Sequence, residues 1–330
     1  MSIFVKEKHI DNRYTYLEKY GNVMWKSFWT PAKYKKNIEK IDIPFLENKM
    51  DDVSRECVKR TILASSLVED KVKTFWSFLV IDIPQTVVGE VGAQLGNSEV
   101  VHAQSYRFLV EKMGMQHLFD RLSEIPVMQG RVEYLNKHLT KSSLSKEKQV
   151  LKKLILFTAL VERISLFTQF YIIMSFNNSN KGLKTLFSLQ SSSATEELHH
   201  YAFGLEIVNI IKKENPGLFD EDLKAFIEDN ISKAHKAESA LIDWIFENGY
   251  PPHLSKFEVV NFLNKNVNQV CEDIGVDLRY DVDEDYYEEK NSWMLQALKP
   301  MEPDFFDNPV GGYSSLEQEI SDEELEEIFG

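Results

Sequence analysis

Apolar residues recur every three or four positions through most of this chain, the period of a helix that packs one face against a core. Long stretches such as residues 131–181 hold neither glycine nor proline, which favours helices over strands joined by turns. Helices are predicted over seven stretches: residues 52–80, 86–113, 117–138, 146–177, 181–213, 220–248 and 254–274. The second is expected to be interrupted near Gly96, and residues 1–50 to be irregular. The sequence therefore predicts an all-α fold.

The most apolar stretch, residues 154–176, carries Glu162 and Arg163 near its middle. Charges at the centre of a membrane span are costly, so a buried bundle helix is the better interpretation. A carboxylate buried on such a helix needs a cation, or must take up a proton. A salt bridge to a neighbouring helix is the plainer alternative for Glu162.

The formal charge of −14 makes nucleic acid or an anionic membrane surface an unfavourable partner. Cys57 and Cys271 are the two cysteines, so no disulfide framework is implied and a cytoplasmic location is expected. After Gly275 the chain becomes acidic, and from residue 299 it combines prolines, glycines and acids that cannot bury much apolar surface. We expect a helical domain over residues 1–298 and a flexible acidic tail over residues 299–330.

A short pattern, Glu-x-x-His, occurs at Glu99 with His102 and again at Glu196 with His199. On a helix this spacing places a carboxylate and an imidazole on one face, one turn apart. Ferritin-like bundles bind two metal ions with such a pair from each of two helices and a lone Glu from each of the other two. The second copy has an overlapping register, Glu197 with His200, which periodicity does not exclude.

Two further acids lie on apolar helices and complete this set. Glu162 is one, and either Glu69 or Asp70 is the other, since periodicity alone does not choose between them. Four carboxylates and two imidazoles suit iron or manganese. A structural zinc site is disfavoured because the set holds no thiolate.

At these residues the chain resembles the small (beta) subunit of class I ribonucleotide reductase, in the branch with Glu as first metal ligand. In that family a tyrosine follows the first Glu-x-x-His by four residues, as Tyr106 does here. The family spacing of 34 residues between the lone Glu and the second pair is matched by Glu162 and Glu196, which selects Glu196 with His199. The family's first ligand lies about thirty residues before the second, and Glu69 fits this better than Asp70.

Two more motifs carry the resemblance, which covers roughly residues 25–330. The run Phe28-Trp29-Thr30-Pro31 matches the family's Phe-Trp-x-Pro, which implies that Trp29 lies on the radical-transfer route. A Phe-Phe-acid segment begins at Phe305 and is followed by Tyr313, the implied relay between subunits. The resemblance also implies a homodimer, and a terminal tail that binds the large (alpha) subunit.

The chain departs from the family at two positions. Thr195 stands where an Asp usually precedes the second Glu-x-x-His, and Ser192 stands where an apolar residue usually lies near the radical tyrosine. The oxidant is therefore assigned either to Tyr106 or to the metals themselves.

The resemblance implies a ribonucleoside-diphosphate reductase in which this chain generates the radical and the large subunit reduces the nucleotide. The chain has no pair of neighbouring cysteines and no Gly-rich phosphate loop, so the nucleotide is expected to bind elsewhere. One rival is a ferritin-like oxidase or oxygenase that acts alone. Another is a bundle for metal storage or structure.

Overall fold

The structure is a computed structural model that describes residues 2–7, 13–72, 74–135 and 144–298. These residues form helices joined by short connections, without a strand, which confirms the all-α prediction. They belong to a compact unit that ends at Leu298. The tail expected over residues 299–330, with Tyr313, lies outside the described residues.

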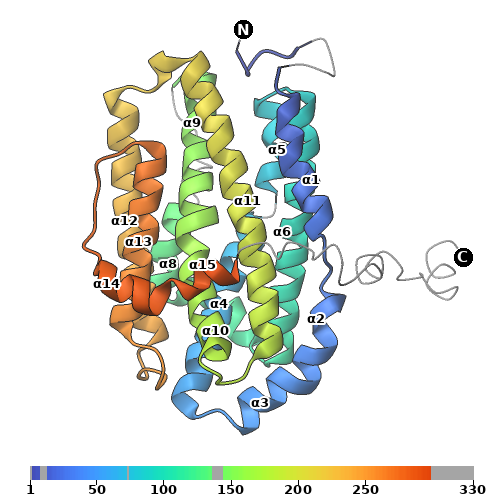
Figure 1. Cartoon of the computed structure of the whole chain (residues 1–330), viewed down its shortest axis with the longest axis vertical. Helices are drawn as coiled ribbons and strands as arrows, with labels where there is room; N and C mark the ends of the chain where they lie inside the picture. The colour runs from blue at the N-terminus through green and yellow to red at the C-terminus, as the bar shows by residue number, and fades with distance from the viewer. Residues whose placement is uncertain (1, 8–12, 73, 136–143, 299–330) are drawn as a thin grey trace, which may run out of the picture. The chain divides into compact units, whose positions relative to one another are not determined.

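Four long helical elements form the centre of the bundle (Figure 1). They are α4 (Asp52–Val72), α6 (Thr86–Lys112), the run of α9 (Lys146–Leu156) into α10 (Leu166–Asn178), and α11 (Lys184–Glu214). Further helices cover this centre: α1 (Glu18–Ser27), α2 (Ala32–Asn37), α3 (Ile43–Asn48), α5 (Phe75–Asp82), α7 (Gln116–Asp120), α8 (Pro126–Leu135), α12 (Glu221–Ile245) and α13 (Lys256–Ile274). No helix among the described residues is long and apolar enough to cross a membrane.

Residues 157–165 join α9 to α10 as a π-helical segment, Phe157–Ser165, in which every residue is buried. Segments of this kind are uncommon and often lie at functional sites. Helix α11 packs closely against it, because a Cβ atom at Gly204 would come within 2.6 Å of Thr158 Cγ2. Glycine at position 204 therefore lets α11 and the π-helical segment approach each other closely.

A buried ion pair supports the same segment. The fully buried Arg131 guanidinium on α8 donates to Glu238 Oε1 on α12 at 2.7 Å. It also donates to Gln169 Oε1 at 2.9 Å and to the backbone carbonyls of Ala64 and Ser165. Arg131 thereby connects α4, α12 and the end of the π-helical segment.

Most of the described residues before position 50 are helical, so the expectation of an irregular segment was wrong. They form α1, α2 and α3, together with a π-helical turn at Ile38–Asp42. Leu17, Met24, Trp29, Tyr34 and Leu46 are buried. These short amphipathic helices gain their stability from packing on the bundle rather than from a long periodic pattern.

Helix α6 runs without a break through Gly96, so the predicted interruption was also wrong. A Cβ atom at Gly96 would overlap the Ser77 hydroxyl of α5, so this glycine serves close packing rather than a bend. Two other predicted helices are divided instead. Residues 52–80 become α4 and α5, and residues 117–138 become α7, a 3-10 turn and α8.

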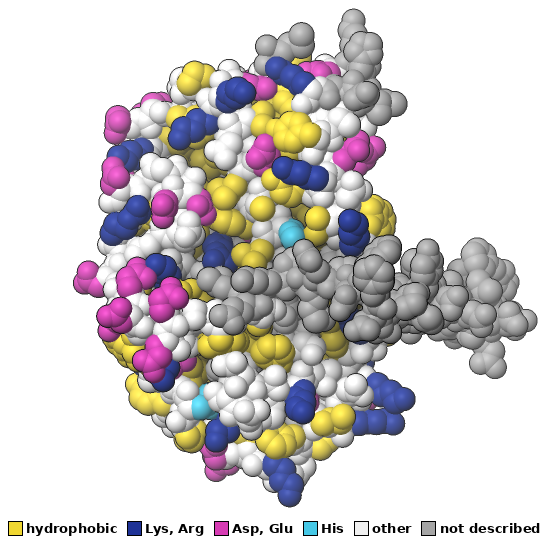
Figure 2. All heavy atoms as spheres, in the orientation of Figure 1, with side chains coloured by type: hydrophobic (Ala, Val, Ile, Leu, Met, Phe, Trp, Pro, Cys, Tyr) yellow, Lys and Arg dark blue, Asp and Glu magenta, His cyan; other side chains and the backbone are white. Residues whose placement is uncertain are grey.

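The acidic connector after α13 is held against that helix by three asparagines, Asn261, Asn264 and Asn268. Their side-chain amides donate to the backbone carbonyls of Asp283, Asp281 and Tyr280 at 2.7 to 3.0 Å. Beyond it lie α14 (Glu284–Tyr286), a π-helical turn and α15 (Trp293–Ala297). Figure 2 shows acidic side chains gathered over α14, on the left of the view.

Candidate metal centre

Six side chains from four helical elements meet in the centre of the bundle, and all are fully buried. They are Glu69 of α4, Glu99 and His102 of α6, Glu162 of the π-helical segment, and Glu197 and His200 of α11. They make two groups of four, in each of which the ligand atoms lie within 4.8 Å of one another. Glu99 and Glu197 belong to both groups. The arrangement suits two metal ions that share two carboxylates.

The structure brings together Glu69, Glu99, His102 and Glu162 as the sequence predicted, but not the favoured pair Glu196 and His199. Glu197 and His200, the overlapping register, take its place. Consecutive residues of an α-helix are rotated by roughly 100°, so a shift of one residue turns a side chain to another face. Glu196 points to the side of the cluster, and His199 is partly exposed.

A signal for the correct register was present in the sequence. Counting seven residues on from His200 gives Ile207, whereas counting from His199 gives Glu206. Gly204, which faces the π-helical segment, lies one turn after His200. The stripe through Glu197 and His200 is therefore the buried face of α11.

Each histidine presents its Nδ1 atom to the acids and has its Nε2 atom held from outside. His102 Nδ1 lies 2.9 Å from Glu197 Oε1, while its Nε2 lies 2.7 Å from Glu196 Oε2. His200 Nδ1 lies 3.1 Å from oxygens of both Glu99 and Glu197, while its Nε2 lies 2.8 Å from Ser98 Oγ. Histidines that bind metals are typically oriented in this way by an outer partner.

Many polar atoms of the cluster make no well-directed hydrogen bond within the described part of the chain, although some lie close to another ligand atom. They are both carboxylate oxygens of Glu69 and of Glu99, together with His102 Nδ1, Glu162 Oε2 and Glu197 Oε1. Buried polar atoms without partners are costly, and here they converge on one place. The residues present therefore fit a pair of divalent ions with oxygen and imidazole ligands.

Burial and neighbouring charges also shift the pKa values of the clustered side chains. Burial raises the pKa of the Glu69, Glu99 and Glu162 carboxyls above the usual value. Burial alone would lower the pKa of His102, but its close contacts with the carboxylates of Glu196 and Glu197 raise it well above the usual value. A metal ion that binds to such side chains displaces the protons that they carry.

Trp76 of α5 contacts the centre, which its place in the sequence does not predict. Its indole N–H donates to Glu162 Oε1 at 2.6 Å, and its side chain is fully buried. Its position in an apolar stretch gave no sign of this hydrogen bond.

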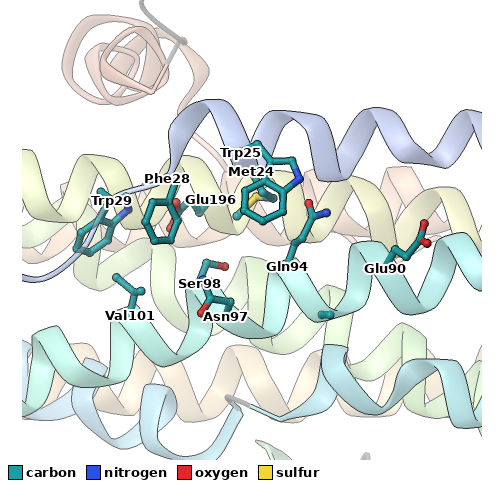
Figure 3. Close-up of a pocket in the computed structure, with 11 residues that line it drawn as sticks. Met24, Trp25, Phe28, Trp29, Glu90, Gln94, Asn97, Ser98, Val101 and Glu196 are labelled. Carbon is teal, nitrogen blue, oxygen red and sulfur yellow. The ribbon is translucent and has the colours of Figure 1, made fainter. Parts of the chain in front are cut away.

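Trp29 lies directly against the cluster, where the resemblance had implied a role in radical transfer. Its ring stacks on that of His102, with centroids 5.9 Å apart and an interplanar angle of 25°. Figure 3 shows Trp29 beside Phe28 and Glu196 in a pocket of about 330 Å³, which Ser98 also lines. The pocket brings a largely apolar surface next to the outer partners of both histidines.

Thr195 stood where the family usually has an acid before the second Glu-x-x-His. That departure disappears when Glu197 and His200 are taken as the second pair. With Glu197 in the cluster, the preceding acid is Glu196, whose carboxylate bonds the outer nitrogen of His102. Thr195 instead donates to the backbone carbonyl of Ser191 at 2.8 Å. The position beside His102 is thus occupied by an acidic side chain, as in the family pattern.

Tyr106 is buried, and its hydroxyl donates to Gln190 Oε1 at 2.6 Å. Burial, and then the nearby Glu69, raise the pKa of Tyr106 well above its usual value. The hydroxyl of Ser192, expected near Tyr106, instead lies 2.6 Å from the Tyr34 hydroxyl. The predicted relay Tyr313 lies outside the described residues.

A family model described as "Ribonucleotide reductase, small chain" matches residues 10–291. The beta subunit of ribonucleoside-diphosphate reductase from Chlamydia pneumoniae is 25% identical over 150 residues. That alignment covers 42% of this chain and 43% of the relative, so the chain matches under half the length of that protein.

Two solved structures share the fold. A putative class I ribonucleotide reductase from Bacillus halodurans has a TM-score of 0.73 at 16% identity, covering 86% of this chain and 99% of the other. The dimanganese(II) form of NrdF from Streptococcus sanguinis has a TM-score of 0.71 at 16% identity, covering 87% of this chain and 97% of the other.

Proposed function

Because the chain belongs to the ribonucleotide reductase small-chain family, we propose that it is the radical-generating beta subunit of a class I ribonucleoside-diphosphate reductase. The observation that carries the proposal is the buried cluster of four carboxylates and two imidazoles, with its unpartnered atoms and with Trp29 stacked on His102. A purely structural bundle would have no reason to bury so many unpaired ligand atoms. Nucleotide reduction itself belongs to the large alpha subunit.

In this proposal the metal ligands are Glu69, Glu99, His102, Glu162, Glu197 and His200. With two iron or manganese ions bound, the centre supplies a strong oxidant after reaction with oxygen species. The surrounding residues exclude water and fix the ligands. Glu196 and Ser98 hold the outer nitrogens of the two histidines, and Trp76 holds one oxygen of Glu162.

Trp29 has the contacts expected of a redox relay. Its ring stacks on that of His102, which places an oxidisable side chain beside a proposed metal ligand. Its indole Nε1 is buried and has no hydrogen-bond partner among the described residues, and Glu196 lies in the same pocket. Tyr313, the docking of the tail on the alpha subunit, the homodimer and the cytoplasmic location remain parts of the proposal that rest on the family.

The test is metal analysis and electron paramagnetic resonance of protein loaded with iron or manganese and exposed to oxygen, followed by assay with a large subunit. We expect two ions per chain, and reduction of ribonucleoside diphosphates only when both subunits are present. A tyrosyl signal lost in Tyr106→Phe would place the stored oxidant on Tyr106. A coupled metal signal unchanged in that variant would place it on the metals.

Fewer than two ions per chain would contradict the site. Oxidation of a small substrate by this chain alone, with no activity beside a large subunit, would favour the stand-alone oxidase. Uptake of many ions per chain would favour storage.

A further inference from the structure

Trp29 is in contact with a second oxidisable ring that neither the sequence nor the family assigns to the site. Tyr34 of α2 packs edge-on against Trp29, with ring centroids 5.3 Å apart and an interplanar angle of 67°. Both rings are buried, at 6% and 4% exposure. His102, Trp29 and Tyr34 therefore form an unbroken series of aromatic contacts that leads outward from the metal centre.

The outer end of this series reaches the part of α11 that also contacts α15. The Tyr34 hydroxyl lies 2.6 Å from Ser192 Oγ on α11. The preceding residue, Ser191, donates from its hydroxyl to the backbone carbonyl of Ala297 at 3.3 Å. Ala297 is the last residue of α15, which reaches α11 in Figure 1, and the unit ends at Leu298.

We propose that Tyr34 is a redox-active residue on the radical route, acting between Trp29 and the next electron donor toward the large subunit. This inference rests on the proposed function, because it needs the oxidant that the proposed metal centre supplies. Oxidation of Tyr34 by the oxidised Trp29 moves one electron from the phenol to the indole and releases the phenol proton. The resulting tyrosyl radical is then reduced, and reprotonated, by the next donor toward the large subunit.

Ser192 gives the phenol proton a path. The serine hydroxyl can accept the proton's hydrogen bond and donate its own, and Ser192 is only partly buried, so water can take the proton on. Trp29, in the connection between α1 and α2, is thus the electron partner of the Tyr34 ring, and Ser192 of α11 is the proton partner of its hydroxyl.

Lys33 provides a restraint on the same ring. Its Nζ atom lies 5.2 Å from the centroid of Tyr34, where a cation disfavours removal of an electron from the ring. A hole on Tyr34 is then short-lived, as a relay requires, and Lys33→Met is expected to lengthen its lifetime.

The first experiment compares Tyr34→Phe with the wild-type chain, both loaded with metal, oxidised and assayed with the large subunit. Phenylalanine keeps the ring and its packing but cannot lose a proton. We expect kcat to fall about a hundredfold or more, with metal content and the stored oxidant unchanged. The control is Tyr14→Phe, which removes another buried hydroxyl, bonded to Glu214, and should leave kcat unchanged.

The second experiment replaces Tyr34 by 3-aminotyrosine, which is easier to oxidise and traps the radical. On mixing with the large subunit and a ribonucleoside diphosphate, an aminotyrosyl signal is expected in electron paramagnetic resonance. A merely structural tyrosine would give no such signal.

Wild-type turnover in Tyr34→Phe, or absence of the aminotyrosyl signal in protein that otherwise turns over, would overturn the role of Tyr34 alone. Failure of the wild-type chain to support nucleotide reduction would overturn the proposed function, and the role of Tyr34 with it.

Discussion

Neutralising one of two adjacent glutamates on α11 separates the two possible registers of the metal centre. Glu197→Gln removes a charge from both four-residue groups, because Glu197 belongs to each. Glu196→Gln removes only the carboxylate that bonds the outer nitrogen of His102. The two variants have the same chemistry and neighbouring positions, so each controls for the other.

The expected magnitudes follow from these positions. Two unit charges about 4 Å apart interact by about 4 kcal/mol at an effective dielectric constant of about 20. Losing one such interaction weakens binding by roughly a thousandfold. Glu197→Gln should therefore fail to retain two ions at micromolar metal. Loss of an outer partner of a ligand typically weakens binding by about 10–100-fold, so Glu196→Gln should still fill both positions when metal is in excess.

The measurement is a titration of metal-free protein with manganese(II) or iron(II) under anaerobic conditions, with bound metal counted after desalting. Circular dichroism of both variants checks that the helices are intact. If Glu197→Gln bound two ions and Glu196→Gln bound fewer, the metal ligand would be Glu196 and not Glu197. That result would also refute the assignment of His200 over His199.

Two further predictions concern the packing that supports the π-helical segment. Arg131→Met leaves Glu238 buried without its cation and should lower the free energy of unfolding by about 3–5 kcal/mol in urea titrations, with most of the loss recovered in Arg131→Met/Glu238→Leu. A loss below about 1 kcal/mol would mean that the pair is not buried as described. Gly204→Ala should cost about 1–3 kcal/mol, because the new methyl group meets Thr158. The control Gly130→Ala, which has nothing within 4 Å of its Cβ position, should be neutral or stabilising, and an equal cost at both positions would argue against close packing at Gly204.

Periodicity and residue type were sufficient for the central helices and for three members of the cluster. Glu99 and His102 lie one turn apart on an apolar helix, and Glu162 is an acid in a stretch too apolar to leave it without a partner. The choice of Glu69 over Asp70 came from spacing within the family. The structure places Glu69 among the other acids, fully buried.

Other features depend on contacts between distant segments. The hydrogen bond from Trp76 to Glu162 and the stacking of Trp29 on His102 each join residues more than seventy positions apart. The short helices of the first fifty residues have too few turns to be recognised by period, and they are stabilised by the bundle beneath them. The role of Gly96 was misread for the same reason, since a glycine that weakens an isolated helix here admits the side chain of Ser77.

The sequence by itself determined which residues could bind metal, and that they lie on helices of one bundle, because the helical period is encoded in local spacing. The Glu-x-x-His pattern did not decide between Glu196 and Glu197, because adjacent residues on a helix are candidates of equal chemistry that differ only by a rotation of roughly 100°. Only the apolar residue Ile207, seven positions after His200, favoured Glu197. That choice was made by packing: Gly204 fits against Thr158, and this contact turns Glu197 and His200 toward the π-helical segment that carries Glu162. Only the tertiary structure brings those surfaces together.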